Sequence, residues 1–184
     1  MKKIILIYCF LAICLVANAQ KFVPEIKTGT QITATAIVGG QEFPLALKII
    51  STTAPYSIGW GVDGYGEGSF EMSEKAFANG TELVQVSQPA LGVTKLGDAQ
   101  TFSVISKDAF KTLTDTKAFT YGGAKFKIKT PETAAIKING KDVDVFHVIN
   151  EDGKQELWVL NNAAFPLIIQ STGQATDIVM SEIK

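Results

Sequence analysis

His147 is the only histidine of the chain and the first residue to test for catalysis. If its segment is a strand, His147 shares one face with the apolar side chains Val143, Val145 and Ile149. A serine nucleophile would need His147 as its base. The segment around Ser69 reads Gly-Glu-Gly-Ser-Phe, however, and lacks the second glycine of a nucleophile elbow. We therefore predict that His147 is a hydrogen-bonded core residue and that the chain has no catalytic residue.

Paired carboxylates are the next candidates for chemistry. Glu67 and Glu71 would lie on one face of a strand about 13 Å apart. This is farther than the separation of roughly 5–9.5 Å between the two carboxylates of a glycosidase. A pair formed across two strands remains open. Asp142-x-Asp144 and Glu151-Asp152-Gly153 offer oxygen ligands, but no segment has the spacing of an EF-hand loop. We predict no metal site and no cofactor.

The first 19 residues have the three parts of a secretory signal peptide. Lys2 and Lys3 form the positive start, Ile4–Val16 is an apolar run, and Ala17-Asn18-Ala19 is a small-x-small cleavage site. The run is shorter than the roughly 20 residues that a membrane-spanning helix needs. We expect cleavage after Ala19 and one β-rich domain over residues 20–184. The mature chain would have no transmembrane helix and would be periplasmic or extracellular.

Removal of this segment limits the chemistry further. Both cysteines, Cys9 and Cys14, would leave with it, so the mature chain could form no disulfide. Acylation at Cys14 is an alternative, although Ile13 is bulkier than the residue that usually precedes a lipoprotein cysteine; an uncleaved anchor is a third. The chain has no arginine, and loss of Lys2 and Lys3 lowers its net charge from −1 to −3. We therefore expect no nucleic-acid partner.

Turn signals recur along the rest of the chain at intervals typical of antiparallel β-structure. Segments rich in Val, Ile, Thr and Phe flank Gly-Gly, Asp-Gly and Asn-Gly turns, which predict four hairpins, one strand that continues from the fourth hairpin, and two closing strands. The predicted strands are Gln31–Val38, Gln41–Ser51, Tyr56–Val62, Tyr65–Met72, Ala118–Tyr121, Ala124–Thr130, Ala135–Ile138, Lys141–Asn150, Gln155–Leu160, Leu167–Ser171 and Ala175–Ile183.

Two short segments break the β pattern and predict helices. Ser73–Gly80 and Ser106–Leu113 each begin with an N-cap serine and carry Ala-Phe three residues later. Each helix would place its phenylalanine, Phe77 or Phe110, on the apolar face of the sheet. The expected fold is mainly β: a strongly curved, half-barrel-like antiparallel sheet with two short helices.

One predicted hairpin is crowded with glycine beside Trp60 and Tyr65. Glycine at alternate strand positions removes the side chains from one face, which happens where a ligand, a ring or another backbone comes close. Two interpretations remain open: a neighbouring aromatic ring fills the space, or the strand is the smooth wall of a ligand groove. The glycines are Gly59, Gly61, Gly64, Gly66 and Gly68.

The C-terminal part carries a resemblance to known proteins. Trp158-Val159-Leu160-Asn161-Asn162, followed by Phe165-Pro166-Leu167-Ile168, resembles the final strand pair of an uncharacterised family of bacterial envelope domains. That family is similar in outline to the LolA/LolB-type fold, in which a curved sheet with short helices in its mouth holds lipid or acyl chains. The resemblance implies a lipid-binding or apolar-ligand-binding cavity. Unlike LolA, this chain has no arginine.

Three functions follow from these observations. The first is a non-enzymatic envelope protein that binds an apolar ligand or lipid in the concavity of the sheet. The second is an interaction or structural module that pairs with an envelope protein through an edge strand or a surface patch. The third is a hydrolase that uses His147 or a cross-strand glutamate pair. For the first function, the predicted lining residues are Trp60, Tyr65, Phe77, Phe110 and Trp158.

Overall fold

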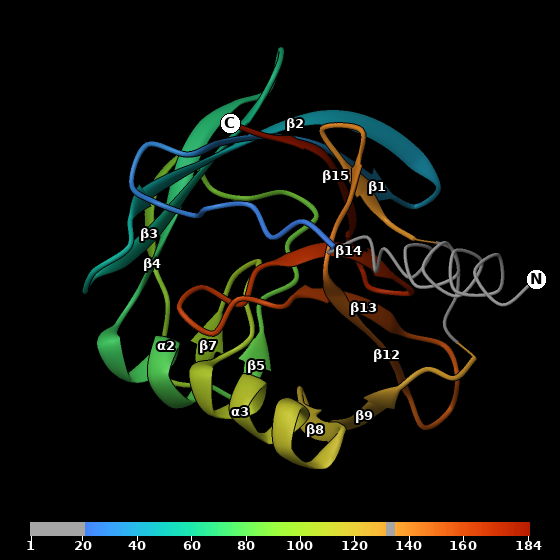
Figure 1. Ribbon diagram of the computed structural model, residues 1–184. Helices are drawn as coiled ribbons and strands as arrows, with labels where there is room; N and C mark the ends of the chain where they lie inside the picture. The colour runs from blue at the N-terminus through green and yellow to red at the C-terminus, as the bar shows by residue number, and fades with distance from the viewer. Residues whose placement is uncertain (1–20, 132–134) are drawn as a thin grey trace, which may run out of the picture.

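The computed structural model describes residues 21–131 and 135–184 of the chain (Figure 1). The predicted signal peptide lies outside these residues. The strands are β1 (Gln31–Val38), β2 (Gln41–Ser51), β3 (Tyr56–Val62), β4 (Gly66–Met72), β5 (Glu82–Leu83), β6 (Gly92–Lys95), β7 (Gln100–Thr101), β8 (Ala118–Tyr121), β9 (Ala124–Ile128), β10 (Lys137–Ile138), β11 (Lys141–Asp142), β12 (Val145–Asn150), β13 (Glu156–Leu160), β14 (Ile168–Thr172) and β15 (Asp177–Ile183). The helices are α2 (Glu74–Asn79) and α3 (Lys107–Thr116).

Eleven of the strands form one sheet in the order β6-β4-β3-β2-β1-β15-β14-β13-β12-β9-β8. Its neighbours pair antiparallel except β4 and β6, which are parallel. Two small sheets, β10–β11 and β5–β7, stand apart from it. The prediction of a mainly-β, mostly antiparallel fold with two short helices is therefore confirmed.

The predicted half-barrel curvature is not what the structure shows. Strands β6 and β8 are the two ends of the large sheet and do not pair with each other. No sheet in the described part of the chain is closed or strongly curled. Apolar alternation along a strand identifies its buried face, but it carries no information on the twist between one strand and the next. The strand pattern could therefore predict the sheet without its curvature.

The hairpin from β1 to β2 shows how closely turn residues determine strand pairing. Gly39 and Gly40 both have positive φ, +57° and +81°. Two such residues form the tight turn whose twist suits antiparallel strands. Val38 then pairs with Gln41, and the register continues without a shift to Gln31 and Lys48.

Serine caps start both helices, as predicted. The Ser73 hydroxyl accepts a hydrogen bond from the Ala76 N–H at 3.1 Å, and the Ser106 hydroxyl accepts one from the Ala109 N–H at 3.3 Å. Such a bond satisfies one of the backbone donors that a helix start leaves without a partner. Helix α3 continues three residues beyond its predicted end and stops at Lys117, which has left-handed backbone geometry.

The large sheet separates two apolar cores. The first core lies against the inner face of β1–β4, by which we mean the face that carries Leu47 and Ile58, and it also contains Leu160 and Ile169. The second core contains α3 with Val159 and Ile168. Neighbouring side chains of β13 and β14 thus enter opposite cores, and residues 167–169 are covered on both faces of the sheet. Figure 1 shows these strands between α3 and the part of the sheet with β1 and β2.

Candidate ligand-binding site

An apolar pocket of about 420 Å³ lies on the inner face of the sheet, at the end formed by the β1–β2 and β3–β4 turns. We call it the inner pocket. Its volume is within the range of about 300–1,000 Å³ that is usual for small-molecule sites. The lining residues come from four adjacent strands, the segment before β6, residue 102, and the start of β15: Ala36, Val38, Gln41, Phe43, Leu45, Trp60, Val62, Tyr65, Phe70, Val86, Ser87, Gln88, Pro89, Phe102, Thr176 and Ile178.

Two of the residues predicted to line a ligand site, Trp60 and Tyr65, meet at this pocket. Their ring centroids are 5.9 Å apart. Trp60 is almost fully buried, whereas Tyr65 and Phe43 are 48% and 38% exposed. Large apolar side chains left exposed beside a cavity are typical of a binding surface rather than of a filled core.

Gly68 makes room for the Trp60 ring. A Cβ atom at Gly68 would lie 2.9 Å from Cζ2 of Trp60 and 2.6 Å from the carbonyl oxygen of Gly92. Any side chain at this position would therefore displace the indole or the backbone of β6. At Gly68 the glycine serves a neighbouring aromatic ring, which was one of the two predicted interpretations.

Residues 84–91, which we call the strap, cover one side of the inner pocket. The Thr176 hydroxyl donates to the carbonyl oxygen of Val86 at 3.0 Å, and the Tyr65 hydroxyl donates to that of Pro89 at 2.9 Å. The backbone N–H of Thr176 also donates to Oε1 of Gln85 at 3.4 Å. The N–H of Val84 donates to the carbonyl oxygen of Thr101 at 2.8 Å. The strap is thus attached to the β14–β15 turn, to the β3–β4 turn and, at its start, to β7. None of its residues belongs to a strand: β5 ends at Leu83, before the strap, and β6 begins at Gly92, after it.

The polar groups of the inner pocket are uncharged. The lining residues within the described part of the chain include no Lys, Asp, Glu or His. The indole N–H of Trp60 is buried and has no hydrogen-bond partner among the described residues. A buried donor without an acceptor is uncommon in folded proteins and calls for an explanation.

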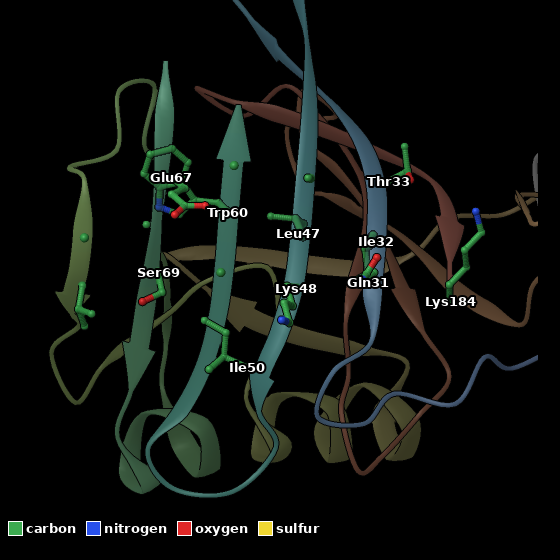
Figure 2. A pocket seen from close by; sticks show the side chains of 16 residues that line it. Gln31, Ile32, Thr33, Leu47, Lys48, Ile50, Trp60, Glu67, Ser69 and Lys184 are labelled. Atoms are coloured by element: carbon green, nitrogen blue, oxygen red, sulfur yellow. The ribbon is translucent and has the colours of Figure 1, made fainter. Parts of the chain in front are cut away.

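A second hollow lies on the outer face of the same strands and is broader, at about 770 Å³. We call it the outer trough. Figure 2 shows Glu67 and Ser69 on β4, Lys48 and Ile50 on β2, and Gln31 on β1 around it. Gly59 and Gly61 line its middle. The Ile50 side chain lies 3.1 Å from where a Cβ atom of Gly59 would be, whereas beside Gly61 the nearest atom is Cβ of Glu67 at 4.0 Å. The outer trough is therefore lined by a mixture of charged, polar and apolar side chains.

The other three predicted lining residues do not reach either hollow. Phe77 is 1% exposed and stacks on Tyr56 at 3.8 Å in the first core. Phe110 belongs to the second core, where it makes an edge contact with Phe146. Trp158 is buried and stacks on His147 at 4.0 Å. The structure therefore does not bring the five residues together: Trp60 and Tyr65 line the inner pocket, Phe77 and Trp158 pack in the first core, and Phe110 packs in the second.

His147 on β12 belongs to a chain of polar contacts with Glu156 on β13 and with Lys129, which directly follows β9. Its Nε2 lies 2.6 Å from Oε2 of Glu156, and the Lys129 ammonium donates to Oε1 of Glu156 at 2.7 Å. Burial raises the pKa of Glu156, but the hydrogen bonds and positive charges of Lys129 and His147 lower it, and the net pKa is below the usual 4.5. The His147 side chain is only 3% exposed. The prediction of a hydrogen-bonded core histidine is confirmed.

Sequence reasoning missed most of the inner pocket. Ala36, Val38 and Phe43 follow the inward alternation of β1 and β2, which could have placed them on the apolar face. The strap carried no such signal, since residues 84–91 have neither a strand period nor a helix cap. The pocket depends on this segment lying across the sheet, and only the tertiary fold shows that.

Within residues 21–131 and 135–184, no group of three or more His, Cys, Asp or Glu side chains is placed to hold a metal ion. The same residues include no helix that is both long and apolar enough to cross a membrane. Comparisons of the chain with protein-family models, with curated proteins and with solved structures found no match. The resemblance to LolA/LolB-type domains therefore stays a prediction.

Proposed function

We propose that this chain is a non-enzymatic, exported envelope protein that binds a small apolar ligand or lipid in the inner pocket. The observation that carries this proposal is an apolar cavity of about 420 Å³ that stays open beside two otherwise tightly packed cores. The pocket opens to solvent at Phe43 and Tyr65, so its apolar lining faces water, and contact between apolar surface and water is unfavourable. A bound apolar molecule would remove that surface from water.

The lining residues suit this role. Phe43 and Tyr65 offer exposed aromatic surface at the edge, and Trp60 supplies a buried ring within. Burial of apolar ligand surface would stabilise the complex by about 25 cal/mol per Å² before the losses of motional freedom are subtracted. Beyond Val84 the strap is held by two hydrogen bonds with Thr176 and one with Tyr65, so it can separate from the sheet at modest cost and admit a ligand.

Fluorescence of the two tryptophans tests the proposal directly. Trp158→Phe leaves Trp60 as the sole tryptophan, and Trp60→Phe leaves Trp158. Titration of Trp158→Phe with decan-2-one, an apolar ketone, should change the emission of Trp60 in a saturable way. The Trp60→Phe variant is the matched control and should show no saturable change. Trp60 also lines the outer trough, so the change should weaken in Ala36→Leu, which narrows the inner pocket, and persist in Val93→Lys, which alters the trough. An unchanged Trp60 signal, equal changes in both tryptophan variants, or a change lost only in Val93→Lys would contradict the proposal.

The outer trough supports a second candidate function, contact with a protein partner in the envelope. Ile50, Leu91 and Val93 are 46%, 64% and 61% exposed. Ile50 and Val93 line the trough, and Leu91 and Val93 flank the start of edge strand β6, which has only β4 as a neighbour. An exposed aliphatic patch beside an unpaired strand edge is typical of surfaces that add a strand or a partner.

Crosslinking in the intact envelope separates the two functions. A partner at the outer trough should be captured by the natural chain and lost in Val93→Lys, because a lysine on an edge strand opposes pairing. Leu45→Ala, which alters the inner pocket, should leave the crosslink unchanged. Loss of the crosslink in Leu45→Ala with retention in Val93→Lys would exclude the outer trough as the contact.

A further inference from the structure

We infer that the ligand of the inner pocket is an uncharged molecule whose polar group is a hydrogen-bond acceptor, such as a ketone or an ester, rather than a free fatty acid or another ion. This inference rests on the proposed function, since it names the class of molecule that the same pocket would take. It follows from the charges, the polar groups and the one unsatisfied donor of the pocket.

The first observation is the absence of charge. None of the described residues that line the inner pocket is charged at neutral pH, although charged side chains are common elsewhere on the sheet and Lys48, Glu67 and Lys184 line the outer trough. An ionised group moved from water into an apolar site without a partner is strongly disfavoured. A carboxylate or an ammonium within the pocket would find no counter-charge there.

The second observation is the kind of polar group at the edge. Gln41, Ser87 and Gln88 line the pocket and are exposed. Amide and hydroxyl side chains both donate and accept hydrogen bonds, so they suit neutral polar groups on a ligand. None of them offers the cationic grip on a carboxylate or phosphate that lysine or arginine gives.

The third observation is the buried indole of Trp60. Its ring lines the pocket, yet its N–H has no acceptor among the described residues. A buried donor without a partner destabilises the protein, and an indole N–H can only donate. A ligand carbonyl that reached this ring would satisfy the donor, and a purely hydrocarbon ligand would leave it unsatisfied. The polar end of the ligand would therefore lie at Trp60, inside the pocket.

A matched set of ligands tests the inference. Decan-2-one, decanoate and decylammonium have the same number of carbons and differ in charge. Their affinities for the full-length protein can be measured by calorimetry at about pH 8, where the carboxylate is ionised and the ammonium is protonated. Decan-2-one should bind, and each ion should bind at least tenfold more weakly. The cost of burying an unpaired charge is more than enough to cause such a loss of affinity.

A second readout follows the donor itself. In ¹⁵N-labelled protein, the indole proton of Trp60 should move downfield as decan-2-one binds, because a new hydrogen bond forms. The indole proton of Trp158 serves as the internal control and should not move.

The outcomes separate this inference from the proposed function. If none of the three molecules binds, the proposed function fails. If decanoate binds as tightly as the ketone, the pocket still binds an apolar chain. The inference that the ligand is uncharged is then wrong, because the carboxylate must lie outside the pocket. If the ketone binds while the Trp60 proton stays in place, the acceptor at Trp60 is wrong.

Discussion

The two tryptophans of the chain mark two regions of the same sheet with opposite packing. Trp158 lies on β13, where both faces of the sheet are covered and its ring stacks on His147. Trp60 lies on β3, where the inner face opens into a cavity and the indole N–H has no partner among the described residues. The difference follows from what covers each region. Helix α3 and the strands of the first core enclose β13, whereas near Trp60 the cover is the strap.

This comparison indicates where the molecule is built for stability and where it can bind. A fully enclosed strand has no space to offer a ligand. A strand end covered by an irregular segment with few hydrogen bonds to the sheet can open locally at a fraction of the cost of global unfolding. The two regions should therefore respond differently to the same kind of substitution.

The largest expected difference comes from truncation of a leucine in each region. Leu160→Ala should lower the free energy of unfolding by about 3–5 kcal/mol, because Leu160 is fully buried in the first core. Leu45→Ala should cost about 2 kcal/mol or less, because Leu45 already faces the inner pocket and loses fewer contacts. Urea unfolding followed by circular dichroism measures both. Equal losses would contradict the contrast between the regions.

The next effect comes from enlargement of an alanine on β1. Ala34 and Ala36 lie on the same face of this strand, but only Ala36 lines the inner pocket. Ala34→Leu should destabilise the protein by about 1–3 kcal/mol through overpacking, whereas Ala36→Leu should leave stability nearly unchanged. Ala36→Leu should also weaken the binding of decan-2-one about tenfold, since the new side chain occupies ligand space. A strongly destabilised Ala36→Leu protein would show that the cavity is not available.

A smaller effect is expected at the strap. Tyr65→Phe removes the hydrogen bond to the carbonyl oxygen of Pro89, and with it about 0.5–1.5 kcal/mol of local stability. Amide hydrogen exchange in residues 84–91 should become faster, while exchange in β13 should not change. Uniformly faster exchange in both segments would indicate a global effect and would contradict a local role for this bond.

The smallest effect concerns pH. Because the pKa of Glu156 is lowered in the folded protein, its contribution to stability is present above the ordinary value of 4.5 and is lost as the pH falls through the folded value. Glu156→Gln should therefore be less stable than the natural chain at pH 7 and should lose less stability on acidification. Unfolding curves between about pH 3 and 7 measure this difference. An identical acid dependence in both proteins would exclude Glu156 as its source.

A second pH measurement, of ligand affinity, extends the comparison to the inner pocket. No carboxyl, amino or imidazole group among the described residues lines the inner pocket. The affinity for decan-2-one should therefore stay constant between about pH 5 and 8, whereas the stability contributed by Glu156 is lost on acidification.

Much of the fold could be predicted because turn chemistry and alternation are local. Gly39-Gly40 predicted the β1–β2 hairpin to the residue, and the serines at 73 and 106 predicted both helix starts. Strands β5, β6 and β7 were not predicted, because each is short and pairs in parallel with a strand that is distant in the sequence. β5 pairs with β7, and β6 pairs with β4. Such pairings leave no local pattern in the sequence.

The candidate site was predicted only in part. Aromatic character beside glycine identified Trp60 and Tyr65, which do meet at the inner pocket. Phe77 and Phe110 were selected because they lie on the short helices, and Trp158 for its aromatic ring; all three pack in the two cores, because an aromatic residue can fill a core equally well. Which role each takes depends on the cover supplied by distant segments.

One titration tests the central claim, that the sheet end at Trp60 binds a ligand and the enclosed region at Trp158 does not. The indole resonances of both tryptophans can be followed in one ¹⁵N-labelled sample as decan-2-one is added. The account predicts a saturable shift of the Trp60 resonance and a fixed Trp158 resonance. No shift of Trp60, or a shift of Trp158 alone, would contradict it.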